Sequence, residues 1–317
     1  MHYLNLKDLP PSPPGKRGWP WTKESPPLPP TMPNGEPWPK ISIVTPSFNQ
    51  GQFIEETIRS VLLQNYPNVE YIIIDGGSTD ETIKIIKKYE PWLKYWVSEP
   101  DRGQSHAINK GFEICSGEIF NWLCSDDIFL PKAFEQVALN IDPVNPCWLI
   151  GGAYRYDEKS KTTSKKLPIT SFDIINFLLW HSRSIAQPSV FWNGLLQSKV
   201  GSLSEKLNYC MDLDLWFRFY QKQQPLFNNG YFSRYRHHSL GKTSPYSHYH
   251  NANMHELAHW MLDNLYRSED EKIICQIGER IIFIQRICAS FERLKNHIVL
   301  GKIIKIWKAL INSKLPI

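Results

Sequence analysis

The sequence predicts an α/β domain in which a mostly parallel sheet is flanked by helices. Short apolar segments typical of strands alternate with segments whose apolar residues recur at helical spacing. Such alternation implies βαβ units, and these build a twisted parallel sheet. The chain has 317 residues, of which 42% are apolar, so it can bury a large core and a disordered chain is excluded.

The regular pattern begins at residue 41. Strands are expected at 41–44, 69–74, 93–98 and 119–123. Helices are expected between them, at 54–62, 78–89 and 105–115. Ser78 and Glu81 have the spacing of a capping box and would begin the second helix. Beyond about residue 150 the pattern is less regular, with one further helix expected at 212–221.

Three regions are expected along the chain. They are a Pro/Trp-rich arm at 1–39, the main domain at 40–250, and a helical extension at 251–317. The arm holds half of the 24 prolines, which exclude a regular helix or central strand because proline lacks an N–H and fixes φ. Its three tryptophans are costly to leave in water, so we expect it to pack along the main domain. A free polyproline arm or an SH3-type ligand is the alternative.

Charge and cysteine usage limit the classes of function. The 36 basic and 31 acidic residues leave a net charge of +5, far from the concentrated basic surface that nucleic-acid binding requires. The six cysteines form no C-x-x-C pair and several lie in apolar runs, which favours a reducing, cytoplasmic location. The sequence shows neither a signal peptide nor an apolar stretch long enough to cross a bilayer, so neither export nor a membrane span is expected.

Polar residues follow each of the four predicted strands. They lie at 45–49, 75–80, 99–105 and 124–127. Each segment alone could be an ordinary turn, but in an open parallel sheet ligands bind beyond the carboxyl ends of the strands. The adjacent carboxylates Asp126 and Asp127 would repel each other unless a cation lies between them or one of them makes hydrogen bonds, and Mg²⁺ or Mn²⁺ suits such ligands. Since no G-x-G-x-x-G follows the first strand, a nicotinamide-binding domain is disfavoured.

Six motifs, taken in order, resemble the family 2 glycosyltransferases of the GT-A fold over roughly residues 41 to 244. They are T-P-S-F-N at 45–49, D-G-G-S-T-D at 75–80, N-K-G at 109–111, L-C-S-D-D at 123–127, M-D-L-D-L-W-F-R at 211–218 and R-H-H at 236–238. The resemblance implies transfer of a sugar, with inversion, from a nucleotide diphosphate sugar to a hydroxyl acceptor. It also implies a divalent metal and an acceptor such as a growing or lipid-linked glycan.

The resemblance also assigns residues to the donor. The nucleotide-sugar site would comprise Thr45, Pro46, Ser47, Asn49, Asp75, Arg102, Ser125 and Asp126. In that assignment Thr45 and Pro46 form the floor of the nucleotide pocket, Asp75 accepts the base N–H, and Asp126 lies on the ribose side. Arg102 would lie beside the base or the diphosphate.

Asp127 resembles the metal ligand of the D-x-D element, in which Cys124 here replaces the first acid. His238 resembles a histidine that closes over the metal or the phosphates, and the adjacent His237 leaves open which ring faces inward. Asp212 occupies the position of the general base, where it would take the proton of the acceptor hydroxyl. The alternative for Asp212 is a helix N-terminal residue favoured by the macrodipole.

Two rival functions follow from the same sequence. The motif H-E-x-x-H, formed by His255, Glu256 and His259, could bind zinc as in a metallopeptidase, and bound zinc after purification would reveal it. A non-catalytic glycan or nucleotide-sugar binding module is the other rival, because both acidic pairs are incomplete. Loss of catalysis should first damage Asp127 or Asp212, and both are present.

The last twenty residues, 298–317, mix isoleucines, leucines and a tryptophan with lysines. A basic amphipathic helix of this kind can lie peripherally on the cytoplasmic face of a membrane, which would suit a lipid-linked acceptor. Its apolar face could equally pack on the main domain. Liposome binding that is lost when residues 298–317 are deleted would indicate the membrane.

Overall fold

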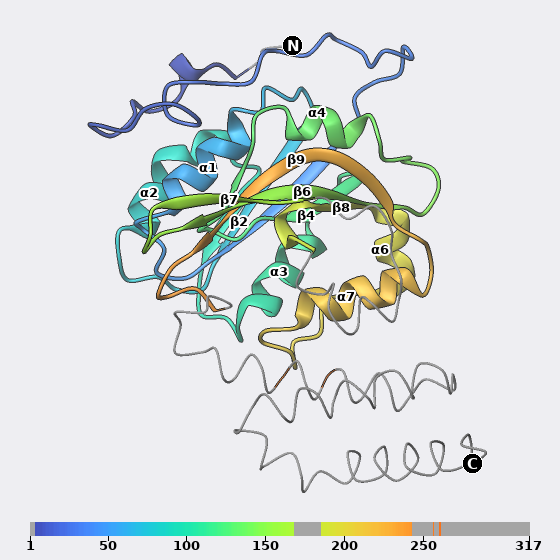
Figure 1. Cartoon of the computed structure of the whole chain (residues 1–317). Helices are drawn as coiled ribbons and strands as arrows, with labels where there is room; N and C mark the ends of the chain where they lie inside the picture. The colour runs from blue at the N-terminus through green and yellow to red at the C-terminus, as the bar shows by residue number, and fades with distance from the viewer. Residues whose placement is uncertain (1–3, 168–184, 243–255, 257–259, 261–317) are drawn as a thin grey trace, which may run out of the picture.

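The computed structural model describes residues 4–167, 185–242, 256 and 260. Within these residues nine strands form a single mixed sheet, with helices on both faces (Figure 1). The strand order is β3-β2-β1-β4-β8-β6-β9-β5, and β7 pairs with β6 at the side of this path. The predicted α/β architecture, a sheet flanked by helices, is confirmed.

The first half of the sheet is parallel. It comprises β1 (Ile41–Ser47), β2 (Val69–Asp75), β3 (Tyr95–Ser98) and β4 (Ile119–Trp122). The connecting helices are α1 (Ile54–Leu62), α2 (Thr82–Tyr89) and α3 (Gln104–Glu113). All four strands and all three helices occur where the sequence predicted them. Gly111 lets α3 lie close on β1, since a Cβ there would overlap the side chain of Val44.

The second half adds antiparallel pairs that the sequence did not predict. Its strands are β5 (Ile128–Phe129), β6 (Trp148–Asp157), β7 (Thr162–Lys166), β8 (Val190–Asn193) and β9 (Leu226–His237). Its helices are α4 (Ala133–Ala138), α6 (Gly194–Val200) and α7 (Met211–Tyr220). Strand β8 runs antiparallel to β4 and joins the two halves, while β6 and β9 pair in parallel. Short 3₁₀ helices occur at Leu6–Asp8, Glu90–Trp92 and Gln187–Ser189.

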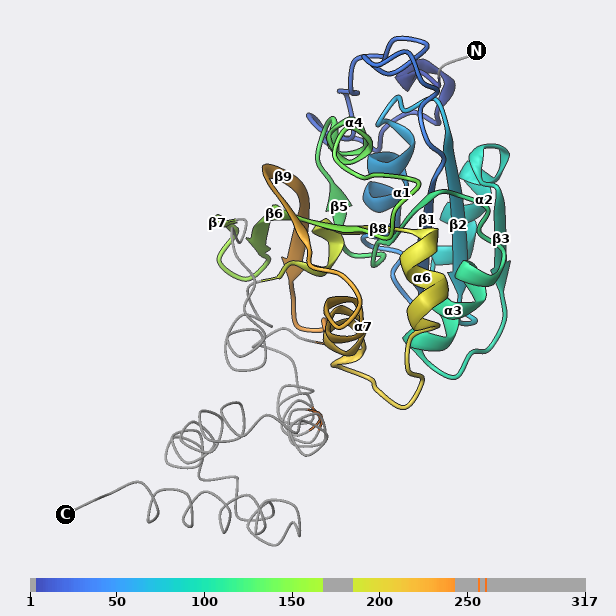
Figure 2. The same cartoon turned by 90° about the vertical axis from the view of Figure 1, so that its right-hand side faces the viewer.

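The helices form two layers. Helices α1, α2 and α4 cover one face of the sheet, and α3, α6 and α7 cover the other (Figures 1 and 2). Four fully buried tryptophans fill the second layer, at positions 122, 148, 192 and 216. The ring of Trp216 in α7 stacks on Trp122 of β4 with centroids 5.5 Å apart. This stacking fixes α7 against β4, so the first turn of α7 lies near the residues that follow β4.

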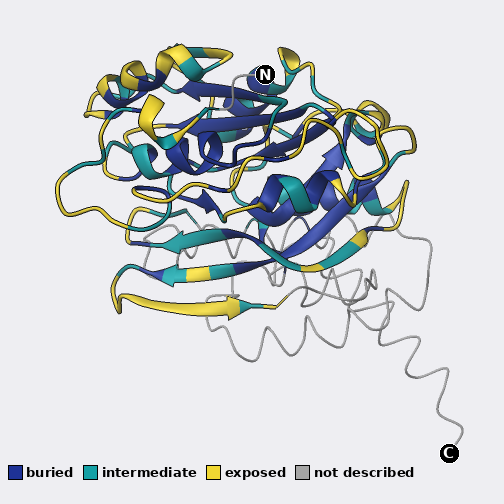
Figure 3. Cartoon of the chain, turned by 90° about the horizontal axis from the view of Figure 1, so that it is seen from above, coloured by how far each residue is buried: buried dark blue, intermediate teal, exposed yellow. Residues whose placement is uncertain are grey.

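Strand burial follows the layers. Every residue of β1 is buried, because both faces of that strand are covered. Residues Thr162 to Lys166 of β7 are almost all exposed and form the open rim that appears yellow in Figure 3. The central strands therefore carry apolar runs, whereas β7 carries hydroxyl and lysine side chains.

The N-terminal arm packs on the main domain, as predicted. Trp21 and Trp38 are buried, and the indole Nε1 of Trp19 donates to the carbonyl of Phe129 at 2.8 Å. Arg59 of α1 is 1% exposed, and its guanidinium donates to carbonyl oxygens of the arm, those of Pro10, Pro20 and Trp21. A buried charge needs such partners, so Arg59 anchors the arm to α1.

The predicted capping box at the start of α2 is wrong. The hydroxyl of Ser78 donates instead to Asp75 Oδ1 at 2.6 Å and accepts the backbone N–H of Asn49. The first N–H of α2, that of Thr82, donates to Asp80 Oδ1 at 3.0 Å. The carboxylate of Asp75 competes for the serine because it ends the preceding strand, a contact that local spacing does not reveal.

Among the residues that the structure describes, no helix is long and apolar enough to cross a membrane. The helical extension at 251–317, apart from Glu256 and Trp260, lies outside the described residues, and so does the amphipathic segment 298–317.

Candidate active site

A cavity of about 730 Å³ opens beyond the carboxyl ends of β1 and β4. The residues around it come from both halves of the sheet and from the first turn of α7. Six of the residues predicted for the site line it, namely Pro46, Ser47, Ser125, Asp126, Asp127 and Asp212. The structure therefore brings the end of the first strand, the end of the fourth strand and the start of α7 to a common cavity.

The loop after β4 carries the groups best suited to a metal ion. Ligand atoms of Cys124, Asp126 and Asp127 all lie within 4.8 Å of one another. Asp127 is 8% exposed, and this burial, together with the adjacent Asp126, raises its pKa well above the ordinary value. Two close carboxylates in a desolvated loop favour a bound cation. The residues present therefore fit a divalent ion, with a thiol in place of one carboxylate.

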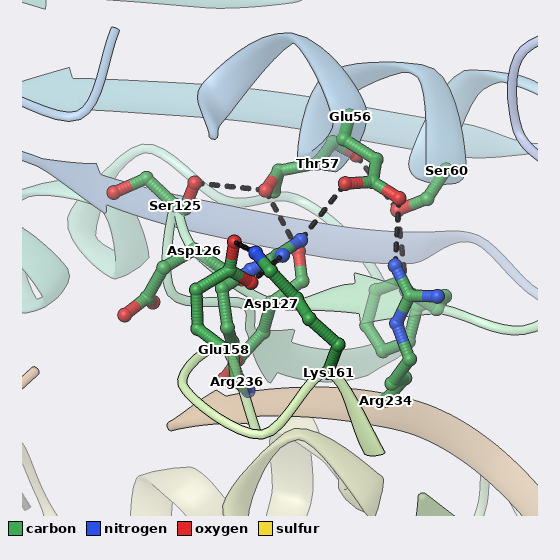
Figure 4. Close-up of polar contacts among 11 residues, drawn as sticks. Glu56, Thr57, Ser60, Ser125, Asp126, Asp127, Glu158, Lys161, Arg234 and Arg236 are labelled. Carbon is green, nitrogen blue, oxygen red and sulfur yellow. Dashed lines mark hydrogen bonds and ion pairs between the residues drawn. The ribbon is translucent and has the colours of Figure 1, made fainter. Parts of the chain in front are cut away.

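Helix α1 holds the backbone of this acidic loop (Figure 4). Oγ1 of Thr57 lies 2.9 Å from the carbonyl oxygen of Ser125 and 2.7 Å from that of Asp127. Its single hydroxyl hydrogen is shared between the two carbonyls. Thr57 is fully buried, so water does not compete for these contacts.

Strand β9 holds the loop from the opposite side through Arg236 (Figure 4). The backbone N–H of Arg236 donates to Asp127 Oδ1 at 2.9 Å, and its Nε donates to the carbonyl of Asp126 at 3.1 Å. The rest of the guanidinium pairs with Glu56 of α1 at 2.8 Å and with Glu158 at 3.0 Å. An arginine whose side chain is 9% exposed thus links three segments around the two aspartates.

The two histidines after β9 have different positions. Nε2 of His238 lies 2.8 Å from Asp126 Oδ2, and its ring packs on Phe53 with centroids 4.7 Å apart. His237 lines the cavity, and burial lowers its pKa. The structure therefore places His238 on the carboxylate of Asp126, while His237 is the histidine that faces the cavity.

Asp212 lies in the first turn of α7 and lines the cavity. Burial raises the pKa of its carboxyl to about 6. Oδ1 of Asp212 accepts the backbone N–H of Leu213 at 2.8 Å. A carboxylate that titrates near neutral pH is suited to take a proton from a hydroxyl group.

Four predicted donor residues lie outside the cavity lining. Thr45 is fully buried and shares a hydrogen bond with the Tyr71 hydroxyl. Asn49 joins its loop to the one after β2, since its side chain accepts the N–H of Thr79. The carboxylate of Asp75 accepts four hydrogen bonds, from Gly77 N, Ser78 N, Ser78 Oγ and Ser98 Oγ. Arg102 is mostly exposed and pairs with Glu205 at 2.8 Å. Their assignment to the nucleotide stays a prediction.

Several lining residues were not predicted. Phe48 is 59% exposed at the cavity and belongs to the T-P-S-F-N segment, so its place could have been inferred from that motif. Arg155, Lys166 and Lys242 bring positive charge to the cavity from β6, β7 and the residues after β9. Burial lowers the pKa of Lys242. No local signal marks Arg155 and Lys166, because the strands that carry them were themselves not predicted.

In the described structure, backbone hydrogen bonds occupy the carboxylate of Glu256, the glutamate of the H-E-x-x-H motif. Its carboxylate accepts backbone N–H groups from Asn208, Tyr209 and Cys210. His255 and His259 lie outside the described residues. A carboxylate that holds three amides is not available as the base of a metallopeptidase.

Comparison with known proteins indicates a family. The family model described as Glycosyl transferase family 2 matches residues 42–195. An uncharacterized glycosyltransferase of Rickettsia prowazekii is 30% identical over 222 residues, which cover 65% of this chain and 66% of that protein. An uncharacterized glycosyltransferase of Mycobacterium tuberculosis is 36% identical over 118 residues, covering 36% of this chain and 45% of the relative. The match to the rickettsial relative thus leaves about a third of that protein's length uncovered.

Solved structures show the same fold. S. aureus TarS in complex with UDP-GlcNAc superposes with a TM-score of 0.61 at 15% identity, covering 84% of this chain and 80% of that one. A second S. aureus TarS structure gives a TM-score of 0.60 at 17% identity, covering 84% of this chain and 49% of that one. The fold is thus that of the GT-A glycosyltransferases. The domain at residues 42–195 belongs to glycosyltransferase family 2.

Proposed function

We propose that this protein transfers a sugar from a nucleotide diphosphate sugar to a hydroxyl group of an acceptor, with inversion at the anomeric carbon. The observation that carries the proposal is the common cavity lined by Asp126, Asp127 and Asp212. The acidic loop suits the diphosphate side when it holds a cation, and Asp212 suits the acceptor side. UDP-GlcNAc in the S. aureus TarS structure supports a nucleotide sugar as the donor class.

Asp212 performs the proton transfer in this proposal. Its carboxylate accepts the proton of the acceptor hydroxyl while the oxygen attacks the anomeric carbon. Attack comes from the face opposite the diphosphate, so the new bond to the acceptor oxygen forms as the bond to the phosphate oxygen breaks. The nucleoside diphosphate leaves with the bonding electrons, and the configuration inverts. A pKa of about 6 leaves Asp212 mostly ionised at neutral pH.

The acidic loop holds Mg²⁺ or Mn²⁺ in this proposal, with Asp127, Asp126 and Cys124 as candidate ligands. When bound, the ion neutralises the charge that develops on the leaving diphosphate. Thr57 and Arg236 keep the loop in position from opposite sides. His238 contacts Asp126 and so orients that carboxylate. Phe48, exposed at the cavity, offers an apolar ring against which a base can stack.

The acceptor in this proposal is a growing or lipid-linked glycan, and the protein acts on the cytoplasmic side. The basic amphipathic pattern of residues 298–317 supports a peripheral place on the membrane face. Gln187 and Pro188, which line the cavity from the sheet's second half, would border the acceptor.

A binding screen tests the proposal. Purified protein is titrated with UDP-, GDP- and dTDP-hexoses in the presence of Mg²⁺, of Mn²⁺, or of EDTA. We expect one nucleotide class to bind with metal and to bind far more weakly with EDTA or in the Asp127→Ala variant. Glu113→Ala, at the exposed end of α3, is the matched control for loss of an acidic side chain and should bind like the wild type. Absence of nucleotide-sugar binding under all three conditions would overturn the proposal.

A further inference from the structure

A glutamate far along the chain holds the backbone in front of α7. Oε1 of Glu256 accepts the N–H groups of Tyr209 at 2.5 Å and of Cys210 at 2.8 Å, and Oε2 accepts that of Asn208 at 2.9 Å. These three residues immediately precede Met211, the first residue of α7. One carboxylate therefore satisfies three consecutive amides that are 46 to 48 residues away in the sequence.

The helix itself explains why an acceptor is needed there. The amides at the start of a helix have no partner within it, and the partial positive charge of a helix N-terminus favours an anion. Cys210, the N-cap residue of α7, makes no side-chain capping hydrogen bond. From outside the helix, Glu256 accepts the N–H of this N-cap residue and places a negative charge near the helix N-terminus.

A second contact joins the same part of the chain to α7. Trp260 is 5% exposed, and its indole Nε1 donates to Asp214 Oδ1 at 3.2 Å. Its ring packs edge-on against Phe217, with centroids 5.9 Å apart. Glu256 and Trp260 thus attach to the N-terminal end and to the middle of the same helix.

The residues that Glu256 holds are part of the active-site wall. Asn208, Tyr209 and Cys210 line the cavity together with Asp212. Only Met211 separates the held backbone from the proposed base. A shift of this backbone would therefore move the carboxylate of Asp212 relative to the acceptor, and small misplacements are costly in catalysis.

The charge of Glu256 also reaches Asp212. Burial has the largest effect on the pKa of Asp212, and two backbone hydrogen bonds come next. Among charged neighbours, Lys166 of β7 then lowers this pKa and Glu256 raises it. The thiol of Cys124, after β4, and Lys242, after β9, also face this part of the cavity. Removal of the negative charge at position 256 should therefore let Asp212 ionise at lower pH.

We propose that Glu256 is a positioning residue of the active site, which holds the 208–210 backbone so that Asp212 faces the acceptor hydroxyl. This inference rests on the proposed function of Asp212. It gives the glutamate of the H-E-x-x-H motif a role in sugar transfer rather than as the base of a metallopeptidase. It also makes Glu256 part of the catalytic unit.

The test compares Glu256→Gln and Glu256→Ala with the wild type in the full-length protein. Amide hydrogen exchange at residues 208–210 measures how well Glu256 protects these backbone amides. Carbon-13 NMR of the Asp212 carboxyl measures its pKa. Nucleoside diphosphate release from UDP-, GDP- and dTDP-hexoses reports turnover between pH 5 and pH 8. Glu113→Gln is the control, because Glu113 is exposed on α3, away from the cavity.

We expect faster exchange at 208–210 in both variants and a lower pKa for Asp212 in Glu256→Gln. We also expect kcat to fall by roughly 10- to 100-fold while the donor KM changes little. The acid limb of the pH profile should move to lower pH. Unchanged exchange at 208–210 and an unchanged Asp212 pKa in Glu256→Gln would overturn the inference, and neither readout requires turnover.

The failure of this inference can be told from the failure of the proposed function. If Asp212→Asn transfers sugar as fast as the wild type, the assignment of the base is wrong. If Asp212→Asn is inactive but Glu256→Gln and Glu256→Ala keep wild-type kcat and pH profile, the base stands and the positioning role is refuted.

Discussion

The backbone N–H of Arg236 donates to Oδ1 of Asp127 at 2.9 Å, across 109 residues of sequence. This contact ties β9 to the loop after β4, and it does so at the buried carboxylate proposed to bind metal. The side chain of Arg236 adds ion pairs with Glu56 and Glu158 and lies over the Phe53 ring, 4.8 Å from its centroid. The geometry of the acidic loop therefore depends on residues outside it.

Replacement of Arg236 should destabilise the whole fold. Arg236→Ala removes one cation from Glu56 and one from Glu158, which keep Arg234 and Lys161 as partners. The Arg236 side chain is only 9% exposed, so the loss of its charge-assisted hydrogen bonds should cost about 1.5–3 kcal/mol. The free energy of unfolding in urea measures the loss. Lys161→Ala is the matched control, since Lys161 also pairs with Glu158 but is exposed, and its transition midpoint should stay close to that of the wild type. An equal effect of both variants would refute the special contribution of the Arg236 ion pairs.

Thr57→Val should weaken the metal site with little change in volume. The valine keeps the shape but leaves the carbonyls of Ser125 and Asp127 without a shared donor, at a cost of about 1–3 kcal/mol. We expect a lower unfolding midpoint and a weaker apparent affinity for Mn²⁺, measured by calorimetry with nucleotide present. Thr163→Val on the exposed strand β7 is the control. If Mn²⁺ affinity is the same in both variants, Thr57 does not position the loop.

Arg59→Met should release the N-terminal arm. The methionine fills a similar space but cannot donate to the carbonyls of Pro10, Pro20 and Trp21, of which only that of Trp21 keeps a further donor, the Ser12 hydroxyl. A buried carbonyl left without a donor costs roughly 1–3 kcal/mol. Limited proteolysis followed by mass spectrometry should show cleavage within the arm in the variant before cleavage in the main domain. Lys88→Met, on the exposed side of α2, provides the comparison. Equal resistance of the arm in all proteins would contradict the anchoring role of Arg59.

Asp212 should make the folded protein less stable as pH rises from about 4 to 6. Its folded-state pKa of about 6 lies above the ordinary value of about 3.9, so the folded protein binds more protons than the unfolded chain in that window. Stability therefore falls as Asp212 ionises. Thermal midpoints at pH 4.5 and 7.5 check this. Asp212→Asn should raise the thermal midpoint above that of the wild type by more at pH 7.5 than at pH 4.5. An equal difference at both pH values would argue against the raised pKa.

The sequence predicted the first half of the sheet because its strands are buried apolar runs, such as 41–44 and 69–74, separated by helices with clear periodicity. It did not predict the second half. In β6 the pairing with β9 shifts register between Ile150 and Ala153, and β7 is a hydroxyl- and lysine-rich strand with no apolar face. A bulge and an exposed rim strand remove the alternation on which strand prediction depends.

The sequence predicted only part of the site, and the reason is similar. Asp126, Asp127 and Asp212 belong to motifs that can be recognised locally, and all three line the cavity. The residues that hold them in place carry no local signal. Thr57 lies on an ordinary amphipathic helix, and Glu256 belongs to a motif that indicates a different chemistry. Their partners lie 46 or more residues away, so only the folded chain reveals them.

Turnover by Asp212→Asn tests the central claim most directly. The wild type and the variant are compared for nucleoside diphosphate binding by calorimetry and for its release from UDP-, GDP- and dTDP-hexoses at pH 7.5. Asparagine keeps the size of the side chain but cannot accept the proton, so we expect unchanged nucleotide binding and a kcat at least about 100-fold lower. Wild-type turnover by the variant would contradict a cavity in which Asp212 serves as the base.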